Sequence, residues 1–121
     1  MIKIFLILVF FSSTVFADEW KTADTYREGT YLILNLIEYG QSSYIVQHPD
    51  QFYQTSNAWA LGKHPDQGRV NVYYGIVMIA HPVIAYYMSD SVRKAFQYFT
   101  IGGKITGISD SFTVGVEVPI K

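Results

Sequence analysis

Three ionisable residues stand near the middle of three separate apolar segments of the chain. Glu38 lies in the first segment, His81 in the second and Lys104 in the third. A carboxylate, an imidazole and an ammonium group at matching depths can pair, and such a cluster either locks the register of helices or handles protons. We expect Glu38 and Lys104 to pair with His81 adjacent to them, and the residue types alone leave both roles open.

Three helices, over residues 22–47, 70–88 and 91–109, are the elements that would position these groups. In each segment the polar residues recur at steps of three and four, so they form one stripe along a mostly apolar helix. The stripe residues of the three helices, in chain order, are Asp24, Glu28, Tyr31, Asn35, Glu38 and Ser42, then Asn71, Tyr74, Met78, His81 and Ala85, then Arg93, Gln97, Thr100, Lys104 and Gly107.

Two arrangements suit such helices. In a soluble bundle the stripes face water, whereas in a membrane bundle they meet inside and the apolar flanks face lipid. Residues 70–88 have no charged side chain and, besides tyrosines, only Asn71 and His81 as clearly polar ones. That is too few for a helix that shows a third of its surface to water. These 19 residues reach about 28 Å, close to the hydrocarbon thickness of a bilayer. We therefore expect an all-α bundle embedded in a membrane, with a soluble exported bundle as the alternative.

The start of the chain has the pattern of a cleavable export signal over residues 1–17. Lys3 precedes an apolar run over residues 4–11, and Val15-Phe16-Ala17 matches a cleavage site. The run is too short to span a bilayer as a helix. Residues 18–121 then suffice for one helical domain, which we expect in the cell envelope.

Two further segments complete the predicted fold. Residues 49–69 hold several prolines and glycines, which predicts an ordered connecting loop. At the C-terminal end, hydrophobic residues alternate with small or polar ones at a period of two, which predicts an extended tail or a short β-strand. The alternating hydrophobic residues are Phe112, Val114, Val116 and Val118.

Composition excludes several classes of function. The chain of 121 residues has a net charge of −1 and no basic cluster, so we expect no nucleic-acid partner. It has no cysteine, which excludes disulfides, thiolate metal sites and cysteine nucleophiles. Two His-Pro-Asp-Gln repeats at 48–51 and 64–67 offer metal donors, but their spacing matches no known ligand pattern, so we predict no metal. No catalytic or cofactor motif is present, which favours a binding protein over an enzyme and implies no cofactor.

Two other groups of residues are candidates for binding or packing. Gly103 and Gly107 form a small-x-x-x-small step, typical of close helix contact within a bundle or between copies, although glycines also allow a helix to fray. The second group lies in and just after the predicted loop, where compact turns serve either recognition or the joining of two helices. Its members are Leu61, Gly62, His64, Pro65, Arg69 and Asn71.

The stretch 57–73 resembles a motif of small uncharacterised phage- and prophage-associated membrane proteins. The motif has the form Asn-x-x-Leu-Gly-x-His-Pro followed by Arg-Val-Asn-x-Tyr. Its residues here are Asn57, Leu61, Gly62, His64, Pro65, Arg69, Val70, Asn71 and Tyr73, with one residue more between Asn57 and Leu61 than the motif has. The resemblance continues at Asp24, Thr25, Arg27, Glu28, Gln41, 48–50, 96–98 and 101–102. It implies a helical envelope protein from a mobile element, and it brings no known activity.

These observations predict a small exported envelope protein, an integral membrane helical bundle that acts by binding another envelope component. Its partners would be the membrane, an envelope protein or a second copy of the chain. The alternative is a soluble periplasmic or secreted helical binding module. A third reading, a membrane enzyme or proton-handling unit, would use Glu38, His81 and Lys104.

Overall fold

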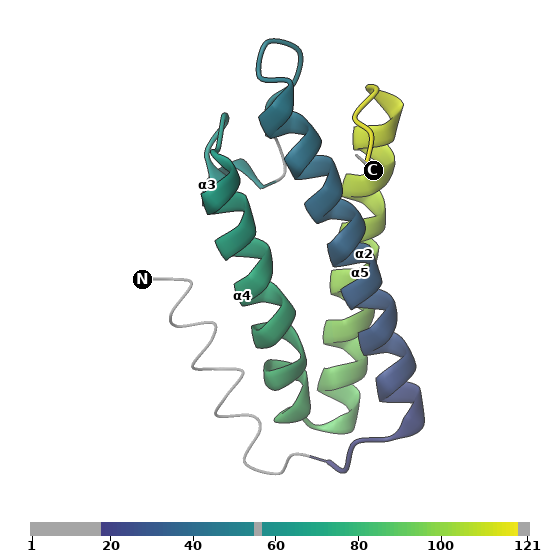
Figure 1. Cartoon of the computed structure of the whole chain (residues 1–121). Coiled ribbons are helices and arrows are strands. Elements are labelled where there is room, and N and C mark those ends of the chain that lie inside the picture. Colours follow the sequence, from purple (N-terminus) through teal and green to yellow (C-terminus); the bar gives the residue numbers. More distant parts are fainter. Residues whose placement is uncertain (1–17, 55–56, 119–121) are drawn as a thin grey trace.

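Three long helices lie side by side, and one short helix sits at an end of the bundle (Figure 1). The computed structural model describes residues 18–54 and 57–118. In chain order the helices are α2 (Thr22–Gln47), α3 (Ala58–Leu61), α4 (Gln67–Tyr86) and α5 (Asp90–Thr113). The all-α prediction is confirmed. The predicted export signal, residues 1–17, lies outside the described residues.

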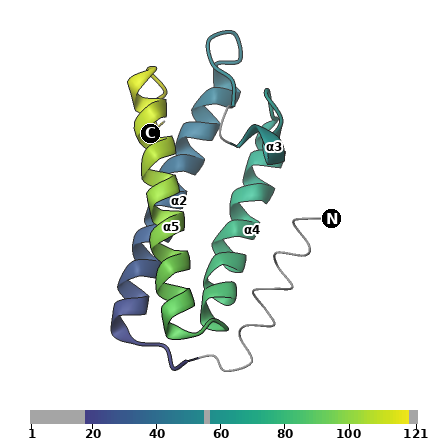
Figure 2. The same ribbon diagram turned by 180° about the vertical axis from the view of Figure 1, so that it is seen from behind.

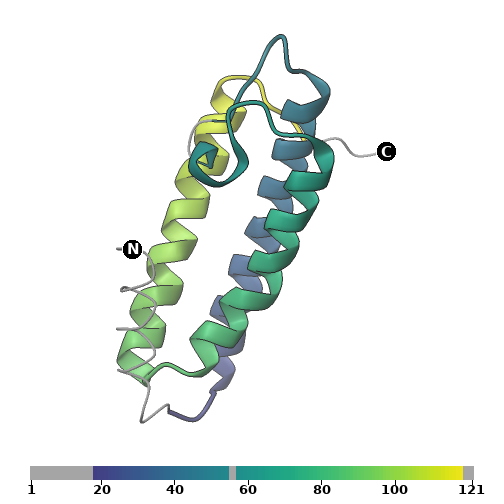
Figure 3. The same ribbon diagram turned by 90° about the vertical axis from the view of Figure 1, so that its left-hand side faces the viewer.

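The chain runs along α2, returns along α4 and runs out again along α5, as the view from behind also shows (Figure 2). α2 packs against both other long helices. From the side the bundle is elongated, with loops gathered at its two ends (Figure 3). We call the end with residues 18–27 and 86–94 the lower end, and the end with residues 47–69 and 110–118 the upper end.

Local signals decide where the helices begin. α2 has the predicted bounds, residues 22–47. α4 begins at Gln67, earlier than the predicted residue 70, because Asp66 Oδ1 accepts a hydrogen bond from the backbone N–H of Arg69 at 2.7 Å and caps the first turn. α5 begins at Asp90, with Ser89 at the N-cap position. The carboxylate of Asp90 thus lies at the positive end of the helix dipole.

The interior of the bundle is polar. Among the described residues, twelve polar or charged side chains are buried, against nine hydrophobic ones. A small apolar cluster of Leu61, Val70 and Tyr74 lies near the upper end. Most of the other buried positions belong to the predicted stripes, so the stripes of the three helices meet inside. The buried polar residues are Asp24, Glu28, Asn35, Glu38, Gln41, Ser42, Ser43, Gln54, His81, Arg93, Gln97 and Lys104.

Hydrophobic side chains accordingly face outward. On α4 the exposed residues Val72, Ile76, Ile79 and Val83 follow steps of four, three and four, which is the opposite stripe of the same helix. α2 exposes Ile33 among others, and α5 exposes further aromatic and aliphatic residues. The bundle therefore has its polar side inward and its apolar side outward.

The prediction of membrane-spanning helices is not supported. Of the helices that the structure describes, none combines the length and the apolar content needed to cross a bilayer. The physical reason is the polar stripe, because each long helix gives about every third or fourth position to a polar residue. In α4, the most apolar helix, Gln67, Arg69, Asn71 and His81 lower the mean hydropathy.

Of the two predicted forms of the C-terminal tail, extended segment or short β-strand, the strand is wrong, because residues 18–54 and 57–118 contain no strand. α5 runs to Thr113 instead of residue 109, and Gly115, with φ +97°, follows in the turn that ends it. A period of two produces a strand only where a neighbouring strand completes the hydrogen bonds, and none is offered here. The tail turns back on the bundle instead, burying Val116 and placing Val118 over Gly40.

The predicted loop over residues 49–69, whose last three residues belong to α4, contains an unpredicted turn of helix, α3. Its last residue, Leu61, is fully buried, and Gly62 follows it with φ +81°, a conformation that favours glycine. The backbone N–H of Gln54 donates to the carbonyl of Lys63 at 2.9 Å, which closes the loop across its base.

Candidate functional site

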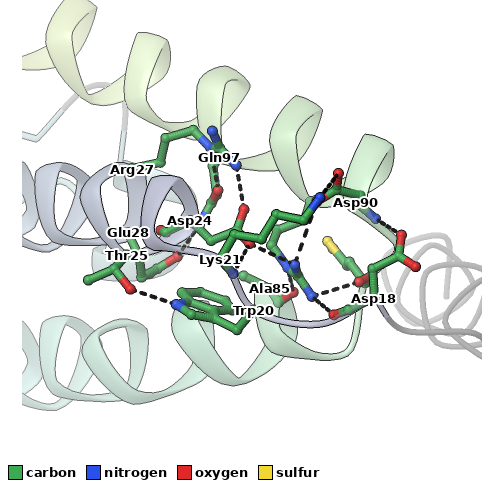
Figure 4. Close-up of polar contacts among 12 residues, drawn as sticks. Asp18, Trp20, Lys21, Asp24, Thr25, Arg27, Glu28, Ala85, Asp90 and Gln97 are labelled. Atoms are coloured by element: carbon green, nitrogen blue, oxygen red, sulfur yellow. Dashed lines mark hydrogen bonds and ion pairs between the residues drawn. The ribbon is translucent and has the colours of Figure 1, made fainter.

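Arg93 holds the lower end of the bundle together (Figure 4 shows the residues around it). The side chain is fully buried, its Nη1 donates to Asp24 Oδ2 at 2.9 Å, and its Nε donates to the carbonyl of Ala85 at 2.8 Å. The last carbonyls of a helix have no partner within it, so this guanidinium caps α4 as well as pairing with α2. Its other acceptors are the backbone carbonyls of Asp18, Glu19, Tyr86 and Met88.

Asp24 is the anion of this lower cluster. Burial by itself raises the pKa of the Asp24 carboxyl, but the backbone N–H of Lys21 and the guanidinium groups of Arg93 and Arg27 outweigh burial and hold that pKa below its ordinary value of 3.8. Gln97 adds a further link, since its Nε2 donates to the carbonyl of Asp24 and its Oε1 accepts from Arg27 Nε at 2.7 Å (Figure 4). The carboxylate is ionised and fully paired.

His81 occupies the middle of the interior. Its Nδ1 lies 2.6 Å from Glu28 Oε2, and its Nε2 lies 2.9 Å from the hydroxyl of Thr100. Its ring stacks between Tyr31 and Phe96, with ring centroids 3.5 Å and 4.5 Å away. A carboxylate, an imidazole and a hydroxyl in series resemble the order of groups in a hydrolase triad.

Thr100 is nevertheless not placed as a nucleophile. Its hydroxyl donates within its own helix to the carbonyl of Phe96 at 2.8 Å. A nucleophile must give its proton to the imidazole and face a space where substrate binds. Thr100 lines neither of the two cavities that the structure describes. The hydrogen bonds from Glu28 through His81 to Thr100 therefore join the three long helices α2, α4 and α5.

Glu38 and Lys104 form the upper ion pair, with Lys104 Nζ 2.8 Å from Glu38 Oε1. The same carboxylate oxygen accepts from Asn57 Nδ2 at 2.8 Å and from the hydroxyl of Tyr74 at 3.1 Å. Burial, followed by the negative charge of Glu38, raises the pKa of Tyr74 far above its ordinary value. Three donors converge on one buried carboxylate oxygen, which fixes the position of Glu38 between α2, α4 and α5.

The three residues singled out from the sequence thus fall into two groups. Glu38 and Lys104 are together, whereas His81 belongs with Glu28. Tyr31 lies between the groups, since its ring stacks on His81 and the ammonium of Lys104 is 5.5 Å from the centroid of the same ring. The carboxylate partners of His81 and Lys104, Glu28 and Glu38, are ten residues apart on α2, which is nearly three helical turns, so a position near the middle of each segment did not imply contact.

The loop residues have mainly structural partners. Gly62 allows the turn after α3, and Arg69 donates from Nε and Nη2 to the carbonyl of Ala60 at 3.2 Å and 2.9 Å. Asn71 Oδ1 accepts from the hydroxyl of Tyr39 at 2.5 Å. Leu61 and Pro65 are buried. His64 is exposed, and its ring makes an edge-type contact with the ring of Tyr53.

The glycine pair does not mediate a contact that the structure describes. A Cβ at Gly103 would meet nothing within 4 Å, so this glycine faces outward. Gly107 lines a cavity instead. Among residues 18–54 and 57–118, no group of three or more histidine or acidic side chains is placed to hold a metal ion.

A cavity of about 310 Å³ opens at the upper end, between α2, α5, the loop and the C-terminal tail. Glu38 forms part of its wall, so the upper ion pair borders this space. Its polar lining residues are Glu38, Gln41, Ser42, Gln51, Gln54, Asn57, Asp110 and Ser111, and its apolar ones include Ile45, Phe52, Tyr53, Val114 and Val116.

Sequence reasoning did not nominate several residues that matter here. Asp24, Glu28, Arg93 and Gln97 were on the predicted stripes, and their steps of three and four were the signal that could have found them. Gln41 lies beside the stripe of α2 and Gln54 in the loop, so no periodicity pointed to either. They meet at the cavity only because the tail and the loop fold over the upper end.

Comparison with models of protein families, with curated proteins and with solved structures finds no match. The resemblance of stretch 57–73 to small phage- and prophage-associated proteins stays a prediction.

Proposed function

We propose that the protein is a small helical binding module of the cell envelope and that its outer surface binds membrane lipid. One observation carries this proposal: the exposed charged side chains lie at the two ends of the bundle. Between the ends, the described residues expose no charged side chain, because Glu28, Glu38 and Lys104 are buried and paired. The exposed charged residues are Asp18, Glu19, Lys21 and Lys94 at the lower end, and Asp50, Lys63, Asp66, Arg69, Asp110 and Glu117 at the upper end.

The uncharged middle section has the height of a lipid hydrocarbon layer. On α4 it extends from Val70 to Tyr86, which is 17 residues or about 26 Å, compared with roughly 30 Å for a bilayer core. None of the described helices has the length and apolar content to cross a bilayer by itself, so the proposed lipid contact is that of the assembled bundle, in which the polar stripes pair inside. The apolar residues of the middle section lie on all three long helices, for example Ile33, Ile79 and Ile105. A single protein partner covers one face, whereas lipid covers a circumference, so this distribution favours lipid.

Aromatic residues at both ends of the section support the same proposal. Tyr86 and Tyr87 are exposed at the lower end, and Tyr53 and Trp59 are exposed at the upper end. Tyrosine and tryptophan gather where hydrocarbon meets the headgroups, because their rings are apolar on one side and hydrogen-bond on the other. The polar interior then has a clear role. The buried polar side chains hold the three long helices together, because most of the large hydrophobic side chains face outward and form no extensive apolar core.

Alkaline carbonate extraction of cells that express the full chain with a C-terminal tag tests the lipid contact. We expect the protein to stay in the membrane pellet. Release into the supernatant would refute lipid binding and would leave the exported module with a protein partner or a second copy on its outer surface. Size-exclusion chromatography with light scattering would then separate those two outcomes.

A matched pair of variants makes the test specific. Ile79→Glu places a charge at a residue that is 71% exposed in the middle of α4, where lipid contact makes a charge cost roughly 2.5–3.5 kcal/mol. Thr113→Glu places the same charge at an exposed position of the upper end. We expect Ile79→Glu to shift protein from pellet to supernatant and Thr113→Glu to behave as the parent does. Equal behaviour of the two variants would contradict lipid contact at the middle section.

A further inference from the structure

Each of two buried amide groups in the wall of the upper cavity has one polar atom without a hydrogen-bond partner. Gln41 is 1% exposed and Gln54 is 5% exposed. Gln41 Oε1 and Gln54 Nε2 have no hydrogen-bond partner among the described residues. Buried polar atoms in folded proteins are nearly always paired, so an unpaired acceptor and an unpaired donor at one cavity indicate a missing partner.

The other contacts of Gln41, and the type of each unpaired atom, decide which hydrogen-bonding groups a ligand must bring. Gln41 Nε2 donates to the carbonyl of Ile108 at 3.1 Å, which sets the orientation of that amide and leaves its oxygen as the free acceptor. Gln54 contributes a free N–H donor. A hydroxyl group donates and accepts at once, and a molecule with several hydroxyls can satisfy both amides. An ammonium group could serve Gln41 only, and a carboxylate could serve Gln54 only.

The remaining lining residues select against an anion. Glu38 and Asp110 bring carboxylates to the wall, and no lysine, arginine or histidine is among the lining residues that the structure describes. The charge of Glu38 is already balanced by Lys104 at 2.8 Å. The site is therefore weakly acidic and rich in hydrogen-bonding groups. Among the other lining residues, Phe52 and Ile45 add apolar surface that suits the C–H face of a ring.

We infer that the upper cavity binds a small neutral ligand that carries several hydroxyl groups, of the size of a single sugar ring. The volume of about 310 Å³ lies at the lower end of the range for ligand pockets, roughly 300–1,000 Å³. This site lies between the upper ends of α2 and α5 and uses none of the exposed residues of the middle section. Of the exposed aromatic residues named above at the ends of that section, it shares Tyr53 alone. Either function can fail without the other.

Thermal unfolding of the full chain, followed by circular dichroism, tests the site with three probes. Glucose is the neutral probe, glucuronate has the same ring with a carboxylate, and ethylammonium is a small cation with N–H donors and no hydroxyl. We expect glucose in excess to raise the unfolding temperature in a saturable way and glucuronate to have little effect. Stabilisation by ethylammonium alone would overturn the inference in favour of a cation site.

Two leucine variants locate the effect. Gln54→Leu removes an unpaired donor and no side-chain hydrogen bond that the structure records, so we expect the unliganded protein to be as stable as the parent or more stable. We expect glucose binding to weaken by about tenfold or more. Gln41→Leu should weaken binding as well, and Gln47→Leu is its matched control, because Gln47 is exposed on the same helix outside the cavity.

Two results would overturn the inference. If glucose does not shift the unfolding temperature of the parent, the two amides are satisfied by water only, which a polar cavity of this size can hold. If glucose stabilises the parent, Gln54→Leu and Gln47→Leu to the same extent, the sugar acts through solvent and not at this cavity.

Discussion

Arg93→Met removes the donor that joins the N-terminal segment, α2 and the end of α4. The methionine side chain has similar length and no polar donor, so it keeps much of the packing and loses the hydrogen bonds. Nε, Nη1 and Nη2 of Arg93 donate to five backbone carbonyls and to Asp24 Oδ2. With both partners 0% exposed, breaking the pair leaves Asp24 as a buried carboxylate with less compensation.

We expect Arg93→Met to lower the free energy of unfolding by about 3–5 kcal/mol, the range for breaking a buried ion pair by removing one partner. Arg27 and the backbone N–H of Lys21 still bind Asp24, so the loss stays below the simple sum over six hydrogen bonds. Relative to a total of about 5–15 kcal/mol for a domain, this loss moves the unfolding midpoint strongly. Guanidinium unfolding of the purified protein, followed by far-ultraviolet circular dichroism, measures it.

Lys94→Met is the matched control, because Lys94 is the next residue and is exposed. It should change the free energy of unfolding by no more than about 0.5 kcal/mol. Asp24→Asn in the Arg93→Met background should recover part of the loss, since it removes the uncompensated charge. An Arg93→Met protein within about 1 kcal/mol of the parent would refute the assignment of Arg93 as the central buried cation.

Three more predictions follow from the interior. The pKa of Asp24 is lower in the folded protein than its ordinary value of 3.8. The ionised carboxylate therefore stabilises the fold above pH 3.8, and this stabilisation is lost as the pH falls below that value. At low pH, the unfolding midpoint of Asp24→Asn should depend less on pH than that of the parent. The pKa of Tyr74 is raised above 10.0, so Tyr74 keeps its proton in the folded state. The free energy of unfolding should therefore fall as the pH rises above about 10, and it should fall less in Tyr74→Phe. Tyrosinate absorbance and circular dichroism, recorded together, measure both effects. Gly29→Ala, with open space around the new Cβ, should stabilise the protein by about 0.5–1 kcal/mol. Gly40→Ala should not, because its Cβ would lie 2.6 Å from Val118 Cγ1; equal midpoints for the two alanine variants would contradict the placement of the tail.

The positions of the polar stripes could be predicted from sequence, because a helix repeats every 3.6 residues whatever surrounds it. Asp24, Glu28 and Glu38 on α2 are buried where the steps of three and four place them. The direction in which the polar stripes face was harder to predict, since the same pattern describes stripes that face water and stripes that face each other. The shortage of polar residues on the rest of residues 70–88 favoured the inward arrangement, and the burial of His81 agrees with it.

Contacts between helices could not be predicted in the same way. The pairing of His81 with Glu28 depends on the axial offset between α4 and α2, and the chain connections leave that offset free within a turn. The prediction of a C-terminal strand was wrong for a different reason. Residues 112–118 have the alternation of a strand, but helix α5 extends through Phe112 because its hydrogen bonds need no second segment. The cavity depends on the C-terminal tail and on the loop, so no periodicity in the sequence could place Gln41 and Gln54 in its wall.

A polar interior also changes how the protein responds to temperature. Unfolding of an ordinary domain exposes buried apolar surface, which raises the heat capacity by about 12–15 cal/mol/K per residue, whereas exposure of polar surface lowers it. Here unfolding brings the carboxylates, amides and guanidinium groups of the interior into contact with solvent, while many large hydrophobic side chains are already outside. The heat-capacity change per residue should therefore lie below the ordinary range. A smaller heat-capacity change gives a flatter curve of unfolding free energy against temperature. On cooling, this bundle therefore loses less stability than a domain of the same length with an apolar core.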